Sequence, residues 1–451
     1  MSTNRRKFIR TVSSSALAIP LISSFGIADA IKDNRVPPLP GANDPKYWDK
    51  LRNQFLLPHD TVFFNTGTLG AMPRVSVNRM VEHVYKVAAN IADWDYRDGG
   101  MKSGEWMSGY WPHSDIREKL AKLINADLNE VALTENVTSA MSYFAIGLDL
   151  KEGDEVITSD QEHPGGRGAW LVKQKRHKVN FREVILPKPA HNPGEIIDLI
   201  VKELTPRTRV IMISHLITGS GAIMPVKEIC AEARKRGIIT VLDGAQALGH
   251  INVDVKDIGC DAYAGCFHKW ILAPAGTGFL YINNDRIKDI WTTLASSQWD
   301  NQEDGGYRLT QRGTGNLSVL LALDASLDFH FAIGPEKVRD RIKFLGNHLR
   351  TGLRKIPEVE IFSPEDESMC AGITVYNVEG FTGPKLQDEF WNRAKMRPRS
   401  SSDIFGVRHC THIYNSVKEI DKALDIVREL AKTGAPALAF SEDRPPILMV
   451  P

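Results

Sequence analysis

Short apolar runs that alternate with amphipathic stretches constrain the fold of this chain more than any other feature of the sequence. From about Thr61 onward, candidate strands such as Val210–Ser214 and Ile238–Leu242 are separated by stretches with helical periodicity, such as Val226–Lys235. Alternating strands and helices build βαβ units, because a parallel neighbouring strand is reached only by a crossover connection. The sequence therefore predicts an α/β protein with a mainly parallel central sheet.

The length of 451 residues exceeds what one simple domain usually needs, so two lobes around a cleft are expected. A parallel sheet binds ligands at the carboxyl ends of its strands, and functional residues are expected there. The predicted parts are an export signal (1–30), an N-terminal segment (31–64), a large domain with the parallel sheet (65–316), a smaller α+β C-terminal domain (317–430) and a tail (431–451).

The first thirty residues have the pattern of an export signal. Arg5 and Arg6 begin a basic stretch, a mild apolar run covers 16–27, and the Ala-Asp-Ala sequence at 28–30 offers a cleavage site. The arginine pair resembles a twin-arginine signal, which exports proteins that are already folded. We therefore expect a periplasmic protein whose mature chain begins near Ile31. The alternative is a basic N-terminus that precedes a frayed helix.

Charge and cysteine content argue against several classes of function. Lysine plus arginine number 56 against 55 for aspartate plus glutamate, and this balance offers no electrostatic footprint for nucleic acid or an anionic membrane. After the signal, no stretch approaches the roughly 20 apolar residues that span a bilayer. The cysteines show no metal-ligand spacing, so no metal site is expected, and free buried thiols are expected with one disulfide as the alternative. They are Cys230, Cys260, Cys266, Cys370 and Cys410.

Two residues near predicted strand ends suit one planar, phosphorylated cofactor. Asp243 follows the predicted strand Ile238–Leu242, and a carboxylate there could keep a pyridine nitrogen protonated, which makes the ring a better electron sink. Lys269 lies 26 residues later in a loop rich in glycine and proline, and a lysine amine condenses with an aldehyde. The alternatives are an acid that merely ends a strand and a surface lysine.

The neighbours of these two residues carry a family resemblance. His268-Lys269-Trp270 is followed by Ala273-Pro274-Ala275-Gly276-Thr277-Gly278 and is preceded by Asp243-Gly244-Ala245-Gln246. This pattern resembles class V aminotransferase-fold enzymes that depend on pyridoxal 5′-phosphate (PLP), in particular their isopenicillin N epimerase-like branch. The match runs from about Asn65 to Leu430. It implies the fold type I architecture, in which a large domain with a mainly parallel central sheet binds PLP and a smaller α+β domain follows.

The resemblance assigns roles to residues around the cofactor. It implies that Lys269 holds PLP as a Schiff base and that Asp243 pairs with the pyridinium nitrogen. His163 matches the residue that stacks on the ring, and Gln246 and His268 are expected to contact the ring hydroxyl and the phosphate, respectively. Without this context, a histidine beside a proline is more often an ordinary loop residue.

The turn Asn136-Val137-Thr138-Ser139 matches the phosphate-binding turn of the family, with Val137 and Thr138 as the binding residues. It is expected to lie between a strand and a helix, where free backbone amides and the helix dipole attract a dianion. The alternative is an ordinary helix cap.

Two further segments are assigned by the resemblance to the substrate and to a second subunit. Arg408 matches the arginine that binds the substrate α-carboxylate, a task that suits the planar guanidinium fork. The alternative is a surface salt bridge, and Arg397 and Arg399 are the next candidates for the carboxylate. Thr314, in the loop 312–316, matches a threonine that reaches the phosphate of the neighbouring subunit, so a homodimer is expected.

Some positions depart from the family pattern. The family often has histidine or another polar residue at Gln246, asparagine near Thr218, and serine or asparagine near Cys266, so these positions leave the reaction type open. Cysteine desulfurases of this fold carry a nucleophilic cysteine shortly before the carboxylate-binding arginine. The corresponding segment 397–403 contains no cysteine, so desulfuration is not expected.

The resemblance therefore implies a PLP-dependent enzyme that acts at the α-carbon of an amino acid or amino-acid-containing metabolite through an external aldimine. Epimerisation, transamination and lysis begin with the same imine, so the residues leave the reaction and the substrate open. The alternatives are a C–S lyase, a periplasmic enzyme that tailors a peptide siderophore, and a cofactor-free binding protein on this fold. A nicotinamide-binding domain is disfavoured because no G-x-G-x-x-G follows a predicted strand.

Overall fold

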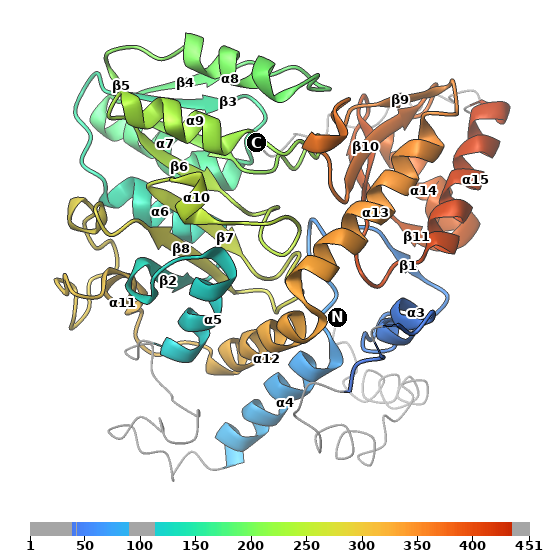
Figure 1. Cartoon of the computed structure of the whole chain (residues 1–451), viewed down its shortest axis with the longest axis horizontal. Coiled ribbons are helices and arrows are strands. Elements are labelled where there is room, and N and C mark those ends of the chain that lie inside the picture. Colours follow the sequence, from blue (N-terminus) through green and yellow to red (C-terminus); the bar gives the residue numbers. More distant parts are fainter. Residues whose placement is uncertain (1–37, 42, 90–112, 435–451) are drawn as a thin grey trace, which may run out of the picture.

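The structure is a computed structural model, and it describes residues 38–41, 43–89 and 113–434. Figure 1 shows a larger α/β lobe and a smaller lobe built around its own sheet, with α12 and α13 running between them. The predicted export signal (1–30) and most of the predicted tail (431–451) lie outside the described residues.

The larger lobe is organised around a seven-stranded sheet in the order β2-β8-β7-β6-β5-β3-β4. Neighbouring strands pair in parallel except for β8, which is antiparallel to both β2 and β7. The prediction of an α/β fold with a mainly parallel sheet is thus confirmed. The strands are β2 (Val131–Thr134), β3 (Glu155–Ser159), β4 (Asn180–Val184), β5 (Thr208–Ser214), β6 (Ile239–Asp243), β7 (Ala262–Cys266) and β8 (Gly278–Ile282).

Helices cover both faces of this sheet, so the central strands are buried on both sides. In β5, Val210 and Met212 belong to the core shared with α6 and α7, whereas Ile211 and Ile213 belong to the core shared with α8 and α9. Successive strand residues point to opposite faces, which explains why this strand reads as a continuous apolar run. The helices of this lobe are α5 (Ser114–Ile124), α6 (Val137–Gly147), α7 (Pro164–His177), α8 (Pro193–Lys202), α9 (Val226–Lys235), α10 (Val255–Ile258) and α11 (Gly305–Thr310), with 3-10 turns η3 (Leu128–Glu130) and η4 (Ile287–Asp289).

The smaller lobe contains a four-stranded antiparallel sheet in the order β12-β13-β10-β9. Its strands are β9 (Val359–Ile361), β10 (Ile373–Val378), β12 (Arg399–Ser402) and β13 (Gly406–Cys410). Helices α13 (Pro335–Leu353), α14 (Gly383–Ala394) and α15 (Val417–Thr433) pack against it, and η5 (Glu367–Met369) precedes β10. The short strands β1 (Val62–Phe63) and β11 (Met396–Arg397) pair in parallel beside it.

The N-terminal segment ties the two lobes together. Helix α3 (Tyr47–Arg52) is followed by β1, and the chain then passes through a loop at 65–70 into α4 (Arg74–Ala89), which packs against α12 (Leu317–Ile333). Within this loop Asn65 bridges to Cys410 of β13, and Gly70 N–H donates to His268 O at 2.7 Å. The loop therefore contacts both lobes at the point where they meet.

Among the described residues, no single helix is both long enough and apolar enough to cross a membrane. Helices α12 and α13 meet that criterion of length and composition only as a pair, and they are bent by 78° relative to each other.

Candidate active site

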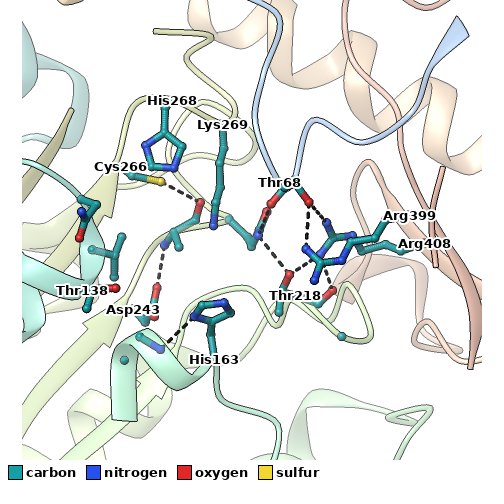
Figure 2. Close-up of a pocket in the computed structure, with 18 of the residues that line it drawn as sticks. Thr68, Thr138, His163, Thr218, Asp243, Cys266, His268, Lys269, Arg399 and Arg408 are labelled. Atoms are coloured by element: carbon teal, nitrogen blue, oxygen red, sulfur yellow. Dashed lines mark hydrogen bonds between the residues drawn. The ribbon is translucent and has the colours of Figure 1, made fainter. Parts of the chain in front are cut away.

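A cavity of about 420 Å³ lies where the carboxyl ends of the parallel strands meet the smaller lobe (Figure 2). All of the predicted site residues except Thr314 line it. Its lining residues are Gly67, Thr68, Asn136, Val137, Thr138, His163, Gly165, Gly166, Thr218, Gly219, Asp243, Ala245, Gln246, Cys266, His268, Lys269, Arg399, Ser401 and Arg408.

Lys269 follows β7 and its half-buried side chain extends into the cavity. Among the described residues its amine takes part in no hydrogen bond or ion pair, which leaves it available to a ligand. The backbone of this turn is closely packed: a Cβ on Gly70 would lie 2.1 Å from Lys269 O. Leu272 adopts φ +63°, a left-handed conformation that is unusual for leucine, so the surrounding contacts hold the segment in shape.

Asp243 is the last residue of β6, and its carboxyl group is buried. One oxygen accepts a 2.9 Å hydrogen bond from Ala245 N–H. The other faces α7, where a Cβ on Gly166 would lie 3.0 Å from it. Burial raises the pKa of Asp243, whereas the Ala245 amide and the Lys269 charge oppose that rise. A buried carboxylate without a fixed cation suits a ligand that brings a protonated nitrogen, such as the pyridinium of PLP.

The N-terminus of α6, where a phosphate is predicted to bind, lies at the cavity. Asn136 caps the helix by accepting a 2.9 Å hydrogen bond from Ser139 N–H, while Val137 and Thr138 stand in the first turn, whose N–H groups have no helical partner. The N-terminus of α7 approaches from the side, since a Cβ on Gly165 would lie 2.5 Å from Thr138 Oγ1. These amides and the hydroxyl fit a dianion at a helix N-terminus.

His163 is the N-cap of α7, and its ring faces the cavity opposite Lys269 in Figure 2. Its Nδ1 accepts a 3.0 Å hydrogen bond from Gly165 N–H, which fixes the orientation of the ring. Partial burial, and then the charge of Lys269, lower the pKa of His163. The ring is therefore neutral at pH 7 and presents a flat face where an aromatic cofactor would lie.

His268, on the other side of Lys269, is held by a longer contact. Its Nδ1 lies 3.4 Å from Thr277 O, and burial lowers its pKa. The ring is therefore neutral as well, and it lines the cavity beside Lys269.

Gln246 has a role that the sequence alone did not reveal. Its Nε2 donates to Gly67 O at 2.9 Å and to Thr218 Oγ1 at 3.1 Å, and its Oε1 accepts a 2.9 Å hydrogen bond from Trp270 Nε1. The amide thus links the loop at 65–70 to the segment that carries Lys269. Only the position of Trp270 directly after the lysine could have suggested this contact.

Arg408 lies in β13 and is 4% exposed. It donates to Thr218 Oγ1 at 2.5 Å, to Asn65 Oδ1 at 3.2 Å and to Thr68 Oγ1 at 3.1 Å. Within the residues that the structure describes it forms no salt bridge, which argues against the alternative of a structural ion pair. Its charge is therefore free for an anionic ligand.

Thr314 is the predicted site residue that lies elsewhere. It is exposed in the loop before α12, outside the cavity. Arg312 of the same loop forms an ion pair with Glu135, so the loop lies next to the start of α6 in the same chain. The contribution of Thr314 to a neighbouring subunit stays a prediction.

All five cysteines are buried and free. Of these, Cys266 lines the cavity, and burial raises its pKa to about 11. It is therefore a neutral thiol at pH 7 rather than an activated nucleophile.

A reactive amine, a buried acid at a strand end and a helix N-terminus around one cavity define the class of PLP-dependent enzymes of fold type I. The chain belongs to the aminotransferase class-V family, whose model matches residues 63–422. This confirms the predicted family, its PLP dependence and its enzymatic nature.

Individual relatives differ in their reactions. The chain is 32% identical over 400 residues to isopenicillin N epimerase of Streptomyces clavuligerus. The aligned region covers 85% of this chain and 98% of that protein. The chain is 25% identical over 408 residues to a probable cysteine desulfurase of Pyrococcus abyssi, covering 85% and 98%. The family therefore includes both reactions among the relatives of this chain.

Solved structures show the same fold. A mutant of C-DES with glycine covalently linked to its PLP cofactor superposes with a TM-score of 0.74 at 24% identity, covering 84% of this chain and 99% of that one. The apo cysteine desulfurase of Thermococcus onnurineus NA1 gives 0.73 at 23% identity, covering 85% and 98%.

Proposed function

We propose that this enzyme acts at the α-carbon of an amino acid or an amino-acid-containing metabolite, with epimerisation as the reaction. The proposal rests mainly on one observation. Lys269, Asp243 and the N-terminus of α6 line one cavity, and Arg408 of the smaller lobe lines the same cavity. The reaction type is supported by the 32% identity to an isopenicillin N epimerase over most of both chains.

The residues that would hold PLP follow from the site. The N–H groups at Val137 and Thr138 would bind its phosphate, Asp243 would keep its ring nitrogen protonated, and His163 would pack against its ring. When bound, PLP withdraws electrons from the bonds at the substrate α-carbon. Lys269 would hold the cofactor in the resting enzyme, and its amine, when it is not bonded to the cofactor, would remove or return a proton at that carbon from its own side of the cavity. Inversion of the α-carbon also requires a proton from the opposite side, where His163 lies (Figure 2).

Arg408 sets the orientation of the substrate. Its guanidinium binds the α-carboxylate through two charged hydrogen bonds, and Thr218 and Asn65 keep the fork in place. When the carboxylate is fixed, the bond to be broken at the substrate α-carbon would be oriented out of the plane of the cofactor ring. Orientation of this kind contributes several kcal/mol to the rate.

A C–S lyase is the second candidate, because cysteine desulfurases are also among the relatives. Within the described cavity Cys266 is the cysteine that lines it, and its raised pKa makes it a poor sulfur acceptor. Ser401, from the segment where desulfurases carry their nucleophile, lines the cavity instead. Elimination at a C–S bond needs no enzyme thiol, so lysis is the form of sulfur chemistry that this site supports.

Two expectations about location and assembly stand beside this function. The twin-arginine pattern supports export to the periplasm, with the mature chain beginning near Ile31. The large exposed apolar residues Trp291, Leu294 and Trp299 lie in the segment that leads to the loop of Thr314, and they support a homodimer in which that loop reaches the neighbouring site.

The experiment is an absorbance titration of the purified holoenzyme with single L- and D-amino acids. The expected result is a visible band that shifts with some members of the panel, and exchange of the α-proton with deuterated solvent for the members that shift it. Conversion of one enantiomer into the other identifies epimerisation, whereas release of pyruvate or sulfide identifies lysis. A colourless protein that takes up no PLP would refute the function.

A further inference from the structure

Arg399 and Arg408 occupy directly opposed positions on the neighbouring antiparallel strands β12 and β13. Opposed residues in such a ladder place their side chains on the same face of the sheet, and like charges there repel each other. Figure 2 shows both side chains together at one end of the cavity. The cross-strand register therefore brings two positive charges to one wall of the site.

Neither arginine is neutralised by the protein around it. Both donate to the same oxygen, Thr68 Oγ1, at 3.0 Å from Arg399 and 3.1 Å from Arg408. In the described part of the chain, no carboxylate lies within ion-pair distance of either guanidinium. Partial burial, and then the neighbouring charge of Arg408, lower the pKa of Arg399. Two adjacent uncompensated cations are unfavourable unless a ligand supplies negative charge.

The two arginines differ in how they are held. Arg408 is buried and has three polar side-chain partners, so its fork has a fixed position. Arg399 is exposed as a whole residue although its guanidinium is partly buried, and it donates to Thr68, so its guanidinium lies at the solvent side of the same wall. One fixed arginine is sufficient for an α-carboxylate. The second arginine is therefore available to another anionic group of the same substrate.

We propose that the substrate carries a second carboxylate on its side chain, which Arg399 binds while Arg408 holds the α-carboxylate. This inference rests on the proposed function, since it takes the cavity to be the site of an amino-acid substrate. Because both guanidinium groups reach one hydroxyl, the two carboxylates are separated by a short carbon chain, as in amino dicarboxylic acids.

The test compares acids with their neutral isosteres. The holoenzyme is titrated with L-aspartate, L-glutamate and L-2-aminoadipate, and with the side-chain amide of each, while the visible absorbance is recorded. The amine-free pair glutarate and glutaramate is titrated by calorimetry, which reports binding independently of the cofactor. We expect at least one acid to bind about 10- to 100-fold more tightly than its amide, as for a charge-assisted hydrogen bond.

The variant Arg399→Met is expected to abolish this preference and to leave the affinity for the amides within about twofold, since the amides do not use the charge. Arg399→Lys keeps the charge without the fork and should retain part of the preference. Arg397→Met is the matched control: Arg397 lies two residues away, stacks 4.1 Å from the Trp391 ring and is not a lining residue. It should behave as the wild type.

The outcomes separate this inference from the proposed function. If acids and amides shift the band equally in the wild type, or if Arg399→Met weakens both equally, the second-carboxylate inference is wrong and the amino-acid function stands. If no amino compound changes the spectrum and glutarate does not bind, both are wrong. Retention of the acid preference in Arg399→Met would also overturn the inference, with its melting temperature confirming that the variant is folded.

Discussion

Trp270 Nε1 donates a 2.9 Å hydrogen bond to Gln246 Oε1, and this contact connects the lysine segment to the substrate side of the cavity. Gln246 in turn donates to Thr218 Oγ1, which also accepts a hydrogen bond from Arg408. The indole is stacked on His250 at 3.5 Å between ring centroids. The residue next to Lys269 thus fixes the orientation of the amide that shares Thr218 Oγ1 with Arg408, the arginine proposed to bind the carboxylate.

Trp270→Phe should destabilise the protein by about 1–3 kcal/mol, because it leaves the buried Gln246 Oε1 without its donor while keeping an aromatic ring against His250. Urea denaturation of wild type and variant measures this difference. Trp391→Phe is the matched control, since that indole is half-buried and donates no hydrogen bond among the described residues. An equal loss in the control would mean that the hydrogen bond to Gln246 is not the cause.

Lys269→Ala should abolish the visible absorbance of the lysine-linked cofactor in the purified protein, because the covalent partner of PLP is removed. Visible absorbance spectra of the purified protein, recorded before and after borohydride reduction, measure this loss. Lys188→Met is the control, since burial lowers the pKa of Lys188 to about 8 and makes it the competing reactive amine near the site. An unchanged, reducible band in Lys269→Ala would refute the assignment.

Arg408→Lys should retain the cofactor and its colour, because lysine keeps the positive charge. Its kcat/KM on the true substrate should fall by a factor that corresponds to about 2–4 kcal/mol of lost transition-state stabilisation, because lysine lacks the bidentate fork. Steady-state kinetics gives the value. Arg397→Lys, outside the cavity, should have wild-type kinetics. Wild-type kinetics for Arg408→Lys would show that a residue other than Arg408 binds the α-carboxylate.

Glu162 should make the stability of the protein depend on pH. It is buried between Ser159 Oγ at 2.6 Å and Ser214 Oγ at 2.5 Å, and burial raises its pKa to about 7. The folded protein therefore holds this proton more tightly than the unfolded chain, whose value is 4.5. The resulting stabilisation is complete below pH 4.5 and is lost as the pH rises to 7, on the order of 3 kcal/mol.

Glu162→Gln removes the titration, so the free energy of unfolding of the wild type minus that of the variant should fall between pH 4.5 and 7. Denaturation curves across this range measure the difference, and the shared titrations of other groups cancel in it. A difference that is flat with pH would show that Glu162 is already ionised at pH 5.

Replacing Arg5 and Arg6 together by lysine should trap the precursor in the cytoplasm, because a twin-arginine signal requires the pair. Fractionation of cells that express each form measures the location of the protein. Replacement of Lys7 by arginine is the control and should leave export intact. Export of the double-lysine form as an unfolded chain would contradict the twin-arginine assignment.

The sequence by itself determined the features that depend on neighbours along the chain. The apolar runs of β5 and β6 are long enough and regular enough to predict parallel strands, because each residue's burial follows from its position in the strand. Asp243 could be placed at the end of a strand for the same reason. Lys269 was identified by the resemblance of its neighbours, His268-Lys269-Trp270 and the glycine-rich segment after them, to the family pattern.

Only the tertiary structure decided how the smaller lobe completes the site. Arg399 faces Arg408 because β12 and β13 pair in one register, with a shift between Ser400 and Ser402, and a slip by one residue would have turned Arg399 to the other face of the sheet. The contact of Trp270 with Gln246, and that of Arg408 with Thr218, likewise join segments far apart in the chain. The contact of Arg408 with Thr218 depends on the packing of the two lobes, and that of Trp270 with Gln246 on the packing of two loops within the larger lobe, which no local pattern of residues encodes.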